Sequence, residues 1–254
     1  MNPLLHTSKL GKTFGGLKAV QSIDLSVASN QILSIIGPNG AGKTTLFNCL
    51  SGIYKPDDGD VFFEGINITG LKPYQICHLG IARTFQNIRL FPGLSALDNV
   101  MIGQFHRRRL HPLAMLFRSE NYCNEEAVGY EAALELLDFV GLADVVHTGA
   151  RNLAYGLQRR LEIARALATS PRVLLLDEPA AGMNPSEAEH MVDLIQRLRG
   201  RGLAIILIEH HMKVVMQISD HIMVLDHGET IATGTPEEVR NDPKVIAAYL
   251  GKES

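Results

Sequence analysis

The sequence contains no tryptophan, only three cysteines and no long hydrophobic run. Cys49, Cys77 and Cys123 lie far apart without the spacing of a metal site, which fits a reducing compartment, and we expect Cys49 to be a core residue of a helix. No apolar stretch approaches the roughly 20 residues needed to span a bilayer, and no signal peptide is present at the N-terminus. These absences predict a protein that is cytosolic or peripheral on the cytosolic side of a membrane.

The sequence also lacks a strong excess of charge of either sign. Its formal net charge is −3, which argues against broad nucleic-acid binding. The chain has 254 residues, of which 46% are hydrophobic and 20% are charged. This composition allows one large soluble α/β domain with an ample core.

A complete phosphate-binding loop is the most informative motif. It reads Gly37-Pro38-Asn39-Gly40-Ala41-Gly42-Lys43-Thr44, between an apolar run with strand character at 32–36 and a helix-compatible stretch at 45–50. The glycines let backbone N–H groups surround phosphate oxygens, and the following helix adds the positive end of its dipole. In such a loop the lysine reaches the outer phosphates and the threonine hydroxyl binds Mg²⁺. The chain is therefore predicted to bind a nucleoside triphosphate.

Hydrophobic patterning divides the rest of the chain into three regions. The first is β-rich, with strands expected at Leu4–Leu10, Ala19–Val27 and Asp60–Glu64. The middle, from about 95 to 170, is helical, with helices expected at Glu125–Val140 and Gln158–Ala168. The last alternates buried strands at Val173–Leu176, Ala204–Ile208 and His221–Leu225 with a helix at Ser186–Arg199. Short, wholly apolar strands between helices indicate a parallel sheet covered on both faces.

Polar residues follow two of these buried strands. Asp177 and Glu178 come directly after the strand at 173–176, at the edge of the sheet where nucleotides bind. We expect Asp177 to hold Mg²⁺ and Glu178 to orient or deprotonate the attacking water. His210 follows the strand at 204–208, so it lies at the same edge and can hold the γ-phosphate and the water.

Three further residues carry little information when read alone. Gln86 precedes the helical region, where an amide oxygen can bind Mg²⁺, yet a plain surface residue is the simpler reading. Gly156 opens a helix and permits close approach to an anion, but by itself it is only a helix cap. Phe14, beside Gly15 and Gly16, could be either a binding-site aromatic or a core residue of a sheet.

In this order, the motifs resemble the ATP-binding subunits of ABC transporters over essentially the whole chain. The resemblance implies one ABC nucleotide-binding domain: a P-loop NTPase core with an N-terminal antiparallel β subdomain at 1–86 and 171–254, and a helical insertion subdomain at 87–170. It implies catalytic roles for Lys43, Glu178 and His210, with Mg²⁺ on Thr44, Gln86 and Asp177. It implies nucleotide binding by Phe14, which would stack on adenine, Val20, Gly37, Pro38, Asn39, Gly40, Ala41, Gly42, Lys43, Thr44, Thr45 and Gln86. The partner's ATP would contact the signature residues Leu153, Ala154, Tyr155, Gly156 and Leu157, with a D-loop at Ala181 to Asn184.

Several details resemble the LivG type, which serves branched-chain amino acid uptake. They are the segments at 152–156, 178–185 and 83–86, the ending Ala248-Tyr249-Leu250-Gly251 and the long middle segment from Gln104 to Glu125. Related lipopolysaccharide-export and urea-uptake ATPases share parts of this pattern. Ala154 and Tyr155 replace the Ser and first Gly of the wider family's signature, as in the LivG type, and Leu157 departs even from that type. Asn184 and His211 each stand where an Asp is usual.

The resemblance implies an ATPase that powers transport across the cytoplasmic membrane from its cytoplasmic side. Its expected cofactors are ATP and Mg²⁺, and its expected partners are two membrane-spanning permease subunits, a second ATP-binding subunit (LivF-like or an identical copy) and, indirectly, an extracytoplasmic substrate-binding protein, with no nucleic acid. In this family two subunits meet head to tail and enclose ATP between them. A non-transport ABC assembly ATPase is the alternative, and a P-loop kinase is a weaker one.

A basic and then apolar segment in the middle region stays ambiguous. His106-Arg107-Arg108-Arg109 is followed by an apolar stretch from Leu113 to Phe117. Contact with lipid headgroups or with the membrane subunit is one interpretation. A solvated loop is the simpler one.

Overall fold

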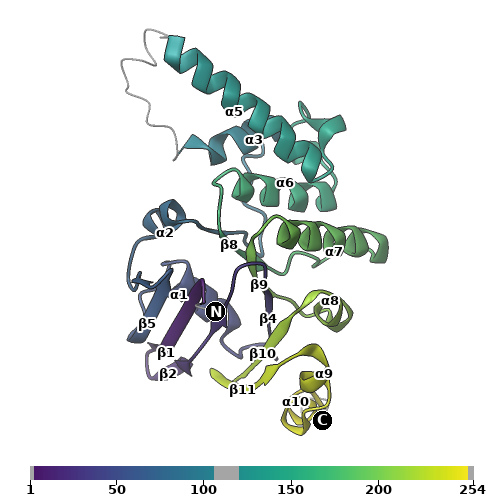
Figure 1. The fold of residues 1–254 in the computed structure, drawn as a ribbon. Coiled ribbons are helices and arrows are strands. Elements are labelled where there is room, and N and C mark those ends of the chain that lie inside the picture. The colour runs from purple at the N-terminus through teal and green to yellow at the C-terminus, as the bar shows by residue number, and fades with distance from the viewer. Residues whose placement is uncertain (1–2, 106–119, 251–254) are drawn as a thin grey trace. The chain divides into compact units, whose positions relative to one another are not determined.

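The structure is a computed structural model that describes residues 3–105 and 120–250. The chain divides into two compact units. The first consists of residues 1–83 and 172–254, and the second of residues 84–171. Figure 1 traces the elements of both units.

A six-stranded sheet forms the centre of the first unit. Its strand order is β11-β10-β4-β9-β8-β7. Its strands are β4 (Ile32–Ile36), β7 (Ile81–Arg83), β8 (Val173–Asp177), β9 (Ala204–Ile208), β10 (His221–Asp226) and β11 (Glu229–Gly234). All neighbours pair in parallel except β10 and β11, which form an antiparallel hairpin.

The central strands are buried at every position, which explains their unbroken apolar sequences. Each residue of β4, β8 and β9 is buried. A strand covered on both faces has no solvent side on which to place polar residues, so alternation disappears. The predicted parallel sheet is therefore confirmed, and its carboxyl edge carries the phosphate loop, Asp177 and the residues after Ile208.

The N-terminal strands form a second sheet, which is antiparallel. It has the order β2-β1-β5-β6, with β3 also paired to β1. Its strands are β1 (Leu5–Phe14), β2 (Leu17–Ile23), β3 (Ser26–Val27), β5 (Asp58–Phe63) and β6 (Ile66–Asn67). The sequence predicted one strand at 19–27, whereas the structure breaks it between β2 and β3, after Ser22 adopts a positive φ of 51°.

Helices cover both faces of the parallel sheet in the first unit. On one face, α1 (Lys43–Leu50) shares a core with both sheets through buried residues such as Phe47, Ile35 and Phe63. Figure 1 shows α7 (Pro185–Gly200) and α8 (Met212–Ile218) on the opposite side of the central strands. The C-terminal helices α9 (Pro236–Arg240) and α10 (Pro243–Leu250) follow β11, and α2 (Pro73–Leu79) precedes β7.

Among the described residues of the second unit, the regular secondary structure is helical, apart from an isolated bridge between Ser95 and Gly149, and turns and loops connect the helices. Its helices are α3 (Ala96–Gly103), α5 (Glu120–Phe139) and α6 (Tyr155–Leu167), with 3₁₀ turns at Ala143–Val145 and Ala150–Asn152. The helices predicted at 125–140 and 158–168 correspond to α5 and α6, which begin five and three residues earlier. The basic segment at 106–109 and the apolar stretch at 113–117 lie outside the described residues.

Candidate functional site

The phosphate loop joins the buried strand β4 to helix α1. Its lysine crosses back over the loop, because the Lys43 ammonium donates to the carbonyls of Gly37 at 2.7 Å and Pro38 at 2.9 Å. Lys43 is only 6% exposed, so its charge is directed at the loop interior rather than at bulk solvent. A cation and the N-terminal N–H groups of α1 thus converge where the phosphates of a nucleotide would lie.

Two glycines of the loop could not be replaced without distorting it. Gly37 has a φ of 146°, and a Cβ there would lie 2.0 Å from the Leu225 carbonyl oxygen. Gly42 has a φ of 98°, and its Cβ would lie 2.2 Å from the Ala19 carbonyl oxygen. The glycine pattern that marks the motif in the sequence therefore reflects close backbone approach as well as positive φ.

Asp177 ends β8 as a buried carboxylate, and its charge is balanced by Arg83. The Arg83 guanidinium donates to Asp177 at 2.9 Å, with both side chains less than a tenth exposed. Arg83 also donates to the Asn48 side chain and to the Ser51 hydroxyl, both of which belong to α1 or its C-cap. The acid that follows the apolar strand is thereby held next to the helix of the phosphate loop.

Glu178 and His210 are in direct contact at the carboxyl edge of the sheet. Their side chains meet at 2.5 Å between Glu178 Oε1 and His210 Nε2. Glu178 has a φ of 50°, an uncommon conformation for a residue with a side chain, which marks a locally strained position. A carboxylate and an imidazole that share a hydrogen bond at this edge can together bind and polarise a water molecule.

Glu209 organises the loops around this pair, although sequence reasoning did not single it out. Its side chain is 1% exposed and accepts the backbone N–H of His210 at 2.7 Å and that of Ala180 at 3.1 Å. It therefore ties the segment after β8 to the segment after β9. The available signal was an acid directly after a buried apolar strand, the same signal that identified Asp177.

The oxygen atoms near the phosphate loop suit Mg²⁺, which shares its ligands with substrate and water, better than a metal ion that is held by protein ligands alone. Among the described residues no group of three or more His, Cys, Asp or Glu could hold a metal ion. Mg²⁺ is usually held by one or two protein oxygens together with substrate phosphates and water. A buried carboxylate at Asp177 and a hydroxyl at Thr44 in the first turn of α1 match that donor set.

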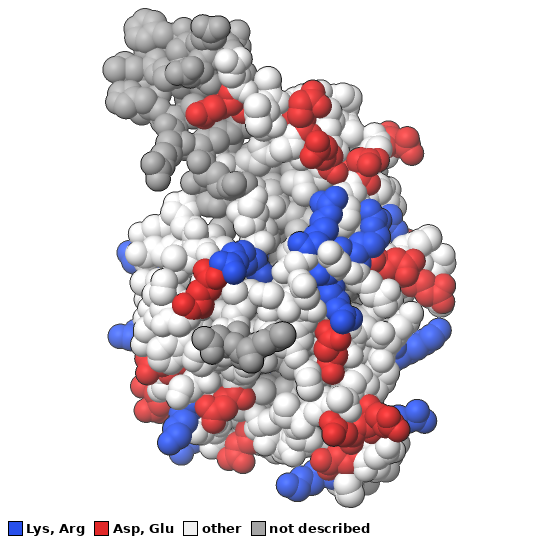
Figure 2. Space-filling view, viewed as in Figure 1, with Lys and Arg blue, Asp and Glu red and all other residues white. Residues whose placement is uncertain are grey.

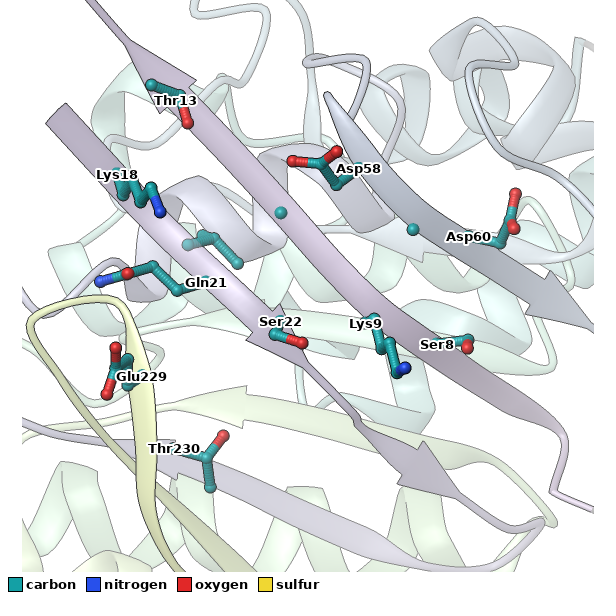
Figure 3. A pocket seen from close by; sticks show the side chains of 13 residues that line it. Ser8, Lys9, Thr13, Lys18, Gln21, Ser22, Asp58, Asp60, Glu229 and Thr230 are labelled. Carbon is teal, nitrogen blue, oxygen red and sulfur yellow. The ribbon is translucent and has the colours of Figure 1, made fainter. Parts of the chain in front are cut away.

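The predicted adenine-side residues lie at the antiparallel sheet. Phe14 is 41% exposed, so it is not a core residue; its ring meets Tyr54 edge-on and carries the Lys12 ammonium 5.4 Å from its centroid. Val20 is buried and lines a polar hollow of about 870 Å³ between β1, β2, β5 and β11. Figure 3 shows Lys9, Lys18, Asp58 and Glu229 around this hollow, which contains no residue of the phosphate loop.

In the second unit, α6 holds the segment that contains Gln86. The buried Arg159 donates to the Phe85 carbonyl at 2.7 Å and to the Gln86 carbonyl. One turn later Glu162, 2% exposed, accepts the backbone N–H groups of Phe85 and Arg89. Burial raises the pKa of Glu162, while these N–H groups and Arg159 partly offset that effect.

The start of α6 leaves its backbone N–H groups open to an anion. Its N-cap residue, Ala154, makes no side-chain capping hydrogen bond, and Gly156 is buried in the first turn. Tyr155, which replaces the first Gly of the wider family's signature, binds the buried Arg159: its hydroxyl accepts a hydrogen bond from the guanidinium at 2.8 Å. Leu153 and Leu157 lie on either side of the first residues of α6, and Leu153 is buried whereas Leu157 is half-buried.

Comparisons with known proteins agree with this arrangement. The sequence model of the ABC transporter family matches residues 20–181, and that of the branched-chain amino acid ATP-binding cassette transporters matches residues 229–254. The chain is 47% identical to the high-affinity branched-chain amino acid transport ATP-binding protein BraF of Pseudomonas aeruginosa and 44% identical to LivG of Escherichia coli K12, in each case over 98% of both chains.

The chain belongs to the ATP-binding proteins of ABC transporters.

Solved structures of ABC cassettes share the fold. A nucleotide-free ATP-binding cassette from an ABC transporter is 35% identical with a TM-score of 0.86, covering 98% of this chain and 100% of that one. The ADP conformation of the cassette MJ1267 is 36% identical with the same TM-score, covering 99% and 100%. The predicted family, fold class and nature as an ATP-binding ATPase subunit are confirmed.

Within this ABC protein, the structure brings together some predicted site residues. Gly37 to Thr45, Asp177, Glu178 and His210 occupy one edge of one sheet, and Gln86 and the signature residues lie together in the second unit through Arg159. Asn184, expected in the D-loop, is the N-cap of α7, where its side chain accepts the Glu187 N–H at 3.0 Å. Arg83, Arg159, Glu162 and Glu209 were missed as participants, because an isolated charged residue gives no hint of a distant partner.

The ABC protein has no described helix that is long and apolar enough to cross a membrane. On the face shown in Figure 2, acidic and basic side chains of the described residues are interspersed. The chain thus belongs to a membrane transport family without a described membrane-spanning helix of its own.

Proposed function

We propose that this chain hydrolyses ATP to power an ABC importer of branched-chain amino acids, from the cytoplasmic side of the inner membrane. The observation that carries the proposal is the likeness to BraF and LivG across 98% of the chain, which includes the C-terminal segment matched by the branched-chain type. Lipopolysaccharide export, urea uptake and non-transport assembly are the competing functions.

The proposed chemistry follows from the residues at the edge of the parallel sheet. The phosphate loop, through Lys43 and the N–H groups of residues 40–45, binds the phosphates and offsets their charge. Glu178 accepts a proton from the attacking water, and His210, hydrogen-bonded to Glu178, holds that water and the γ-phosphate. Thr44 and Asp177, with Gln86, would hold Mg²⁺, which would neutralise charge on the β- and γ-phosphate oxygens.

The signature helix α6 is proposed to act on the nucleotide of a second ATP-binding subunit. Its open N-terminal N–H groups would bind that subunit's γ-phosphate, since Ala154 supplies no hydroxyl. Such a dimer closes when ATP is present and loosens after hydrolysis, which drives two permease subunits between two states. An extracytoplasmic binding protein would select the cargo, and this chain would not contact it.

Uptake by the reconstituted transporter tests the proposal. The chain is expressed with its genomic neighbours, purified from membranes by a tag and placed in proteoliposomes with the binding protein. We expect two polytopic subunits to copurify, and labelled leucine to accumulate with ATP but not with Lys43→Ala. Lys55→Ala, which removes an exposed lysine outside the loop, serves as the control and should keep uptake. Uptake of urea but not leucine, or recovery of soluble partners alone, would contradict the proposal.

A further inference from the structure

Glu209 is a buried carboxylate at the edge of the sheet where the proposed water-activating pair lies. It follows Ile208, the last residue of β9, and directly precedes His210. In the described part of the chain it forms no ion pair with a lysine or an arginine, and the ring of the exposed His211 lies 3.9 Å away. A carboxylate buried in this way is costly unless hydrogen bonds satisfy its oxygens. The bonds that Glu209 accepts therefore indicate what it does.

The two oxygens of Glu209 bind two different loops. Oε1 accepts the backbone N–H of Ala180 at 3.1 Å, in the loop after β8 that contains Glu178. Oε2 accepts the backbone N–H groups of His210 at 2.7 Å and of His211 at 3.3 Å, in the loop after β9. One carboxylate thus holds the loop of each member of the pair, with one oxygen for each loop.

The loop after β8 holds Glu178 in an uncommon backbone conformation, with a φ of 50°. The Glu178 N–H donates to the Ile208 carbonyl at 2.9 Å, and the Glu178 carbonyl accepts the N–H of Ala181 at 3.2 Å, which closes a turn. Within this turn, the N–H of Ala180 is bound by Glu209. A positive φ at a residue with a side chain persists only where the surrounding structure enforces it. Ile208 and Glu209, which are adjacent in the chain, both contribute to that enforcement.

We propose that Glu209 is a positioning residue for ATP hydrolysis: its two oxygens fix the loops after β8 and β9 so that the side chains of Glu178 and His210 meet at 2.5 Å. The inference rests on the proposed ATPase function and adds to it a residue that acts through this pair. The competing explanation is that Glu209 only stabilises the fold. A buried charge without a cationic partner is a poor means of stabilisation, because its desolvation opposes folding.

The substitution Glu209→Gln separates the two explanations, because it keeps the size of the side chain and replaces one acceptor oxygen by an NH₂ group. That NH₂ group would face a backbone N–H, so one of the two loops would lose its hydrogen bond. Steady-state ATP hydrolysis by the purified full-length protein should show a kcat lowered about tenfold to hundredfold, as expected when a reacting group is misplaced by about 1 Å. The Kd for a fluorescent ATP analogue with Mg²⁺ should change less than about twofold, since the phosphate loop is untouched.

Thr7→Val is the matched control for a merely structural effect. Thr7 is 5% exposed, and its hydroxyl also joins two backbone segments, since it donates to the Ile23 carbonyl and accepts the Leu25 N–H within the antiparallel sheet. This variant should lower the unfolding temperature and leave kcat unchanged. Glu209→Asp is a second test variant, which keeps both oxygens and the charge but shortens the side chain by one methylene. It should also lower kcat, so the test does not depend on the folding of the amide variant.

A double variant tests whether Glu209 acts through Glu178. The base is already absent in Glu178→Gln, so adding Glu209→Gln should lower the single-turnover rate by less than about threefold. In the wild-type background the same substitution should cost about tenfold to hundredfold. A residue that only stabilises the folded chain would lower the rate by the same factor in both backgrounds.

Each result bears on the inference in a defined way. A wild-type kcat in Glu209→Gln and Glu209→Asp, beside normal hydrolysis by the unchanged protein, would overturn the positioning role and leave the ATPase assignment intact. Equal losses in both backgrounds, an equal loss in Thr7→Val, or the failure of both Glu209 variants to fold would assign Glu209 to folding and also overturn it. Absence of hydrolysis by the unchanged protein would contradict the ATPase function itself, and the inference with it.

Discussion

The two units of the chain hold their functional residues in different ways. In the first unit the polar groups lie at the carboxyl edge of a buried parallel sheet, where Lys43 binds its own loop, Asp177 binds Arg83, and Glu178 binds His210. In the second unit the segments proposed to act on the nucleotide are held through backbone groups, namely the carbonyls of residues 85–86 and the N-terminus of α6. A single buried pair on α6, Arg159 and Glu162, holds the first of these.

This difference shows how side-chain chemistry and backbone positioning are divided. In the first unit, the pair proposed to activate water, Glu178 and His210, and the proposed phosphate cradle around Lys43 are each held by hydrogen bonds between their own groups. In the second unit the buried pair Arg159 and Glu162 binds backbone groups instead, and it joins the segment at 85–89 to helix α6. Variants in the first unit should therefore change the chemical step, and variants at the Arg159–Glu162 pair should change the integrity of the second unit.

The largest effect is expected from Glu178→Gln in the first unit. The amide cannot accept the proton of the attacking water, so the hydrolysis rate should fall on the order of a thousandfold. Nucleotide affinity should be retained, because the phosphate loop is untouched, and ATP-bound dimers should accumulate on size-exclusion chromatography. Steady-state hydrolysis and nucleotide titration measure the two quantities. Hydrolysis at the wild-type rate would show that Glu178 is not the base and that the first unit does not hold its chemistry at this edge.

A smaller effect is expected from Arg159→Met in the second unit. It leaves the Glu162 carboxylate buried without its cation and frees two backbone carbonyls, so the free energy of unfolding should fall by about 3 kcal/mol. Urea unfolding measures it, with Arg160→Met as the control at a neighbouring, less buried arginine of the same helix.

The double variant Arg159→Met with Glu162→Leu sharpens the result. Removing both charges together should restore much of the lost stability, because the cost arises from the unpaired buried charge rather than from the missing pair. If the single and double variants are equally unstable, then the hydrogen bonds of Arg159 to residues 85–86, and not its pairing with Glu162, stabilise the unit.

The sequence predicted the first unit better than the second, for a physical reason. The wholly apolar strands of a parallel sheet can be recognised in the sequence. The residues that follow these strands lie at one edge of the sheet, and this predicted the positions of Asp177, Glu178 and His210. The edge strand β7 and the antiparallel β11 were not expected, because β7 has only three residues and β11 has no buried residue, so neither contains a long run of buried apolar residues. Helical periodicity located α5 and α6 but says nothing about which loop a charged side chain reaches, so Arg159 and Glu162 could not be assigned partners.

The smallest effect concerns the pH dependence that Glu162 gives to the second unit. Burial raises its folded-state pKa above 4.5, so the folded protein binds a proton more tightly than the unfolded chain does. Stability should therefore fall as pH rises from about 4.5 through the folded-state pKa, and become independent of this group above it. Glu162→Gln, which stays neutral, should lose this part of the slope, whereas Glu135→Gln on the exposed side of α5 should not. The free energy of unfolding is measured at a series of pH values for each protein. If its slope against pH is the same in wild type and Glu162→Gln, burial does not raise the pKa of Glu162. The N–H partners and Arg159 would then stabilise this carboxylate fully, as Arg83 does for Asp177 in the first unit.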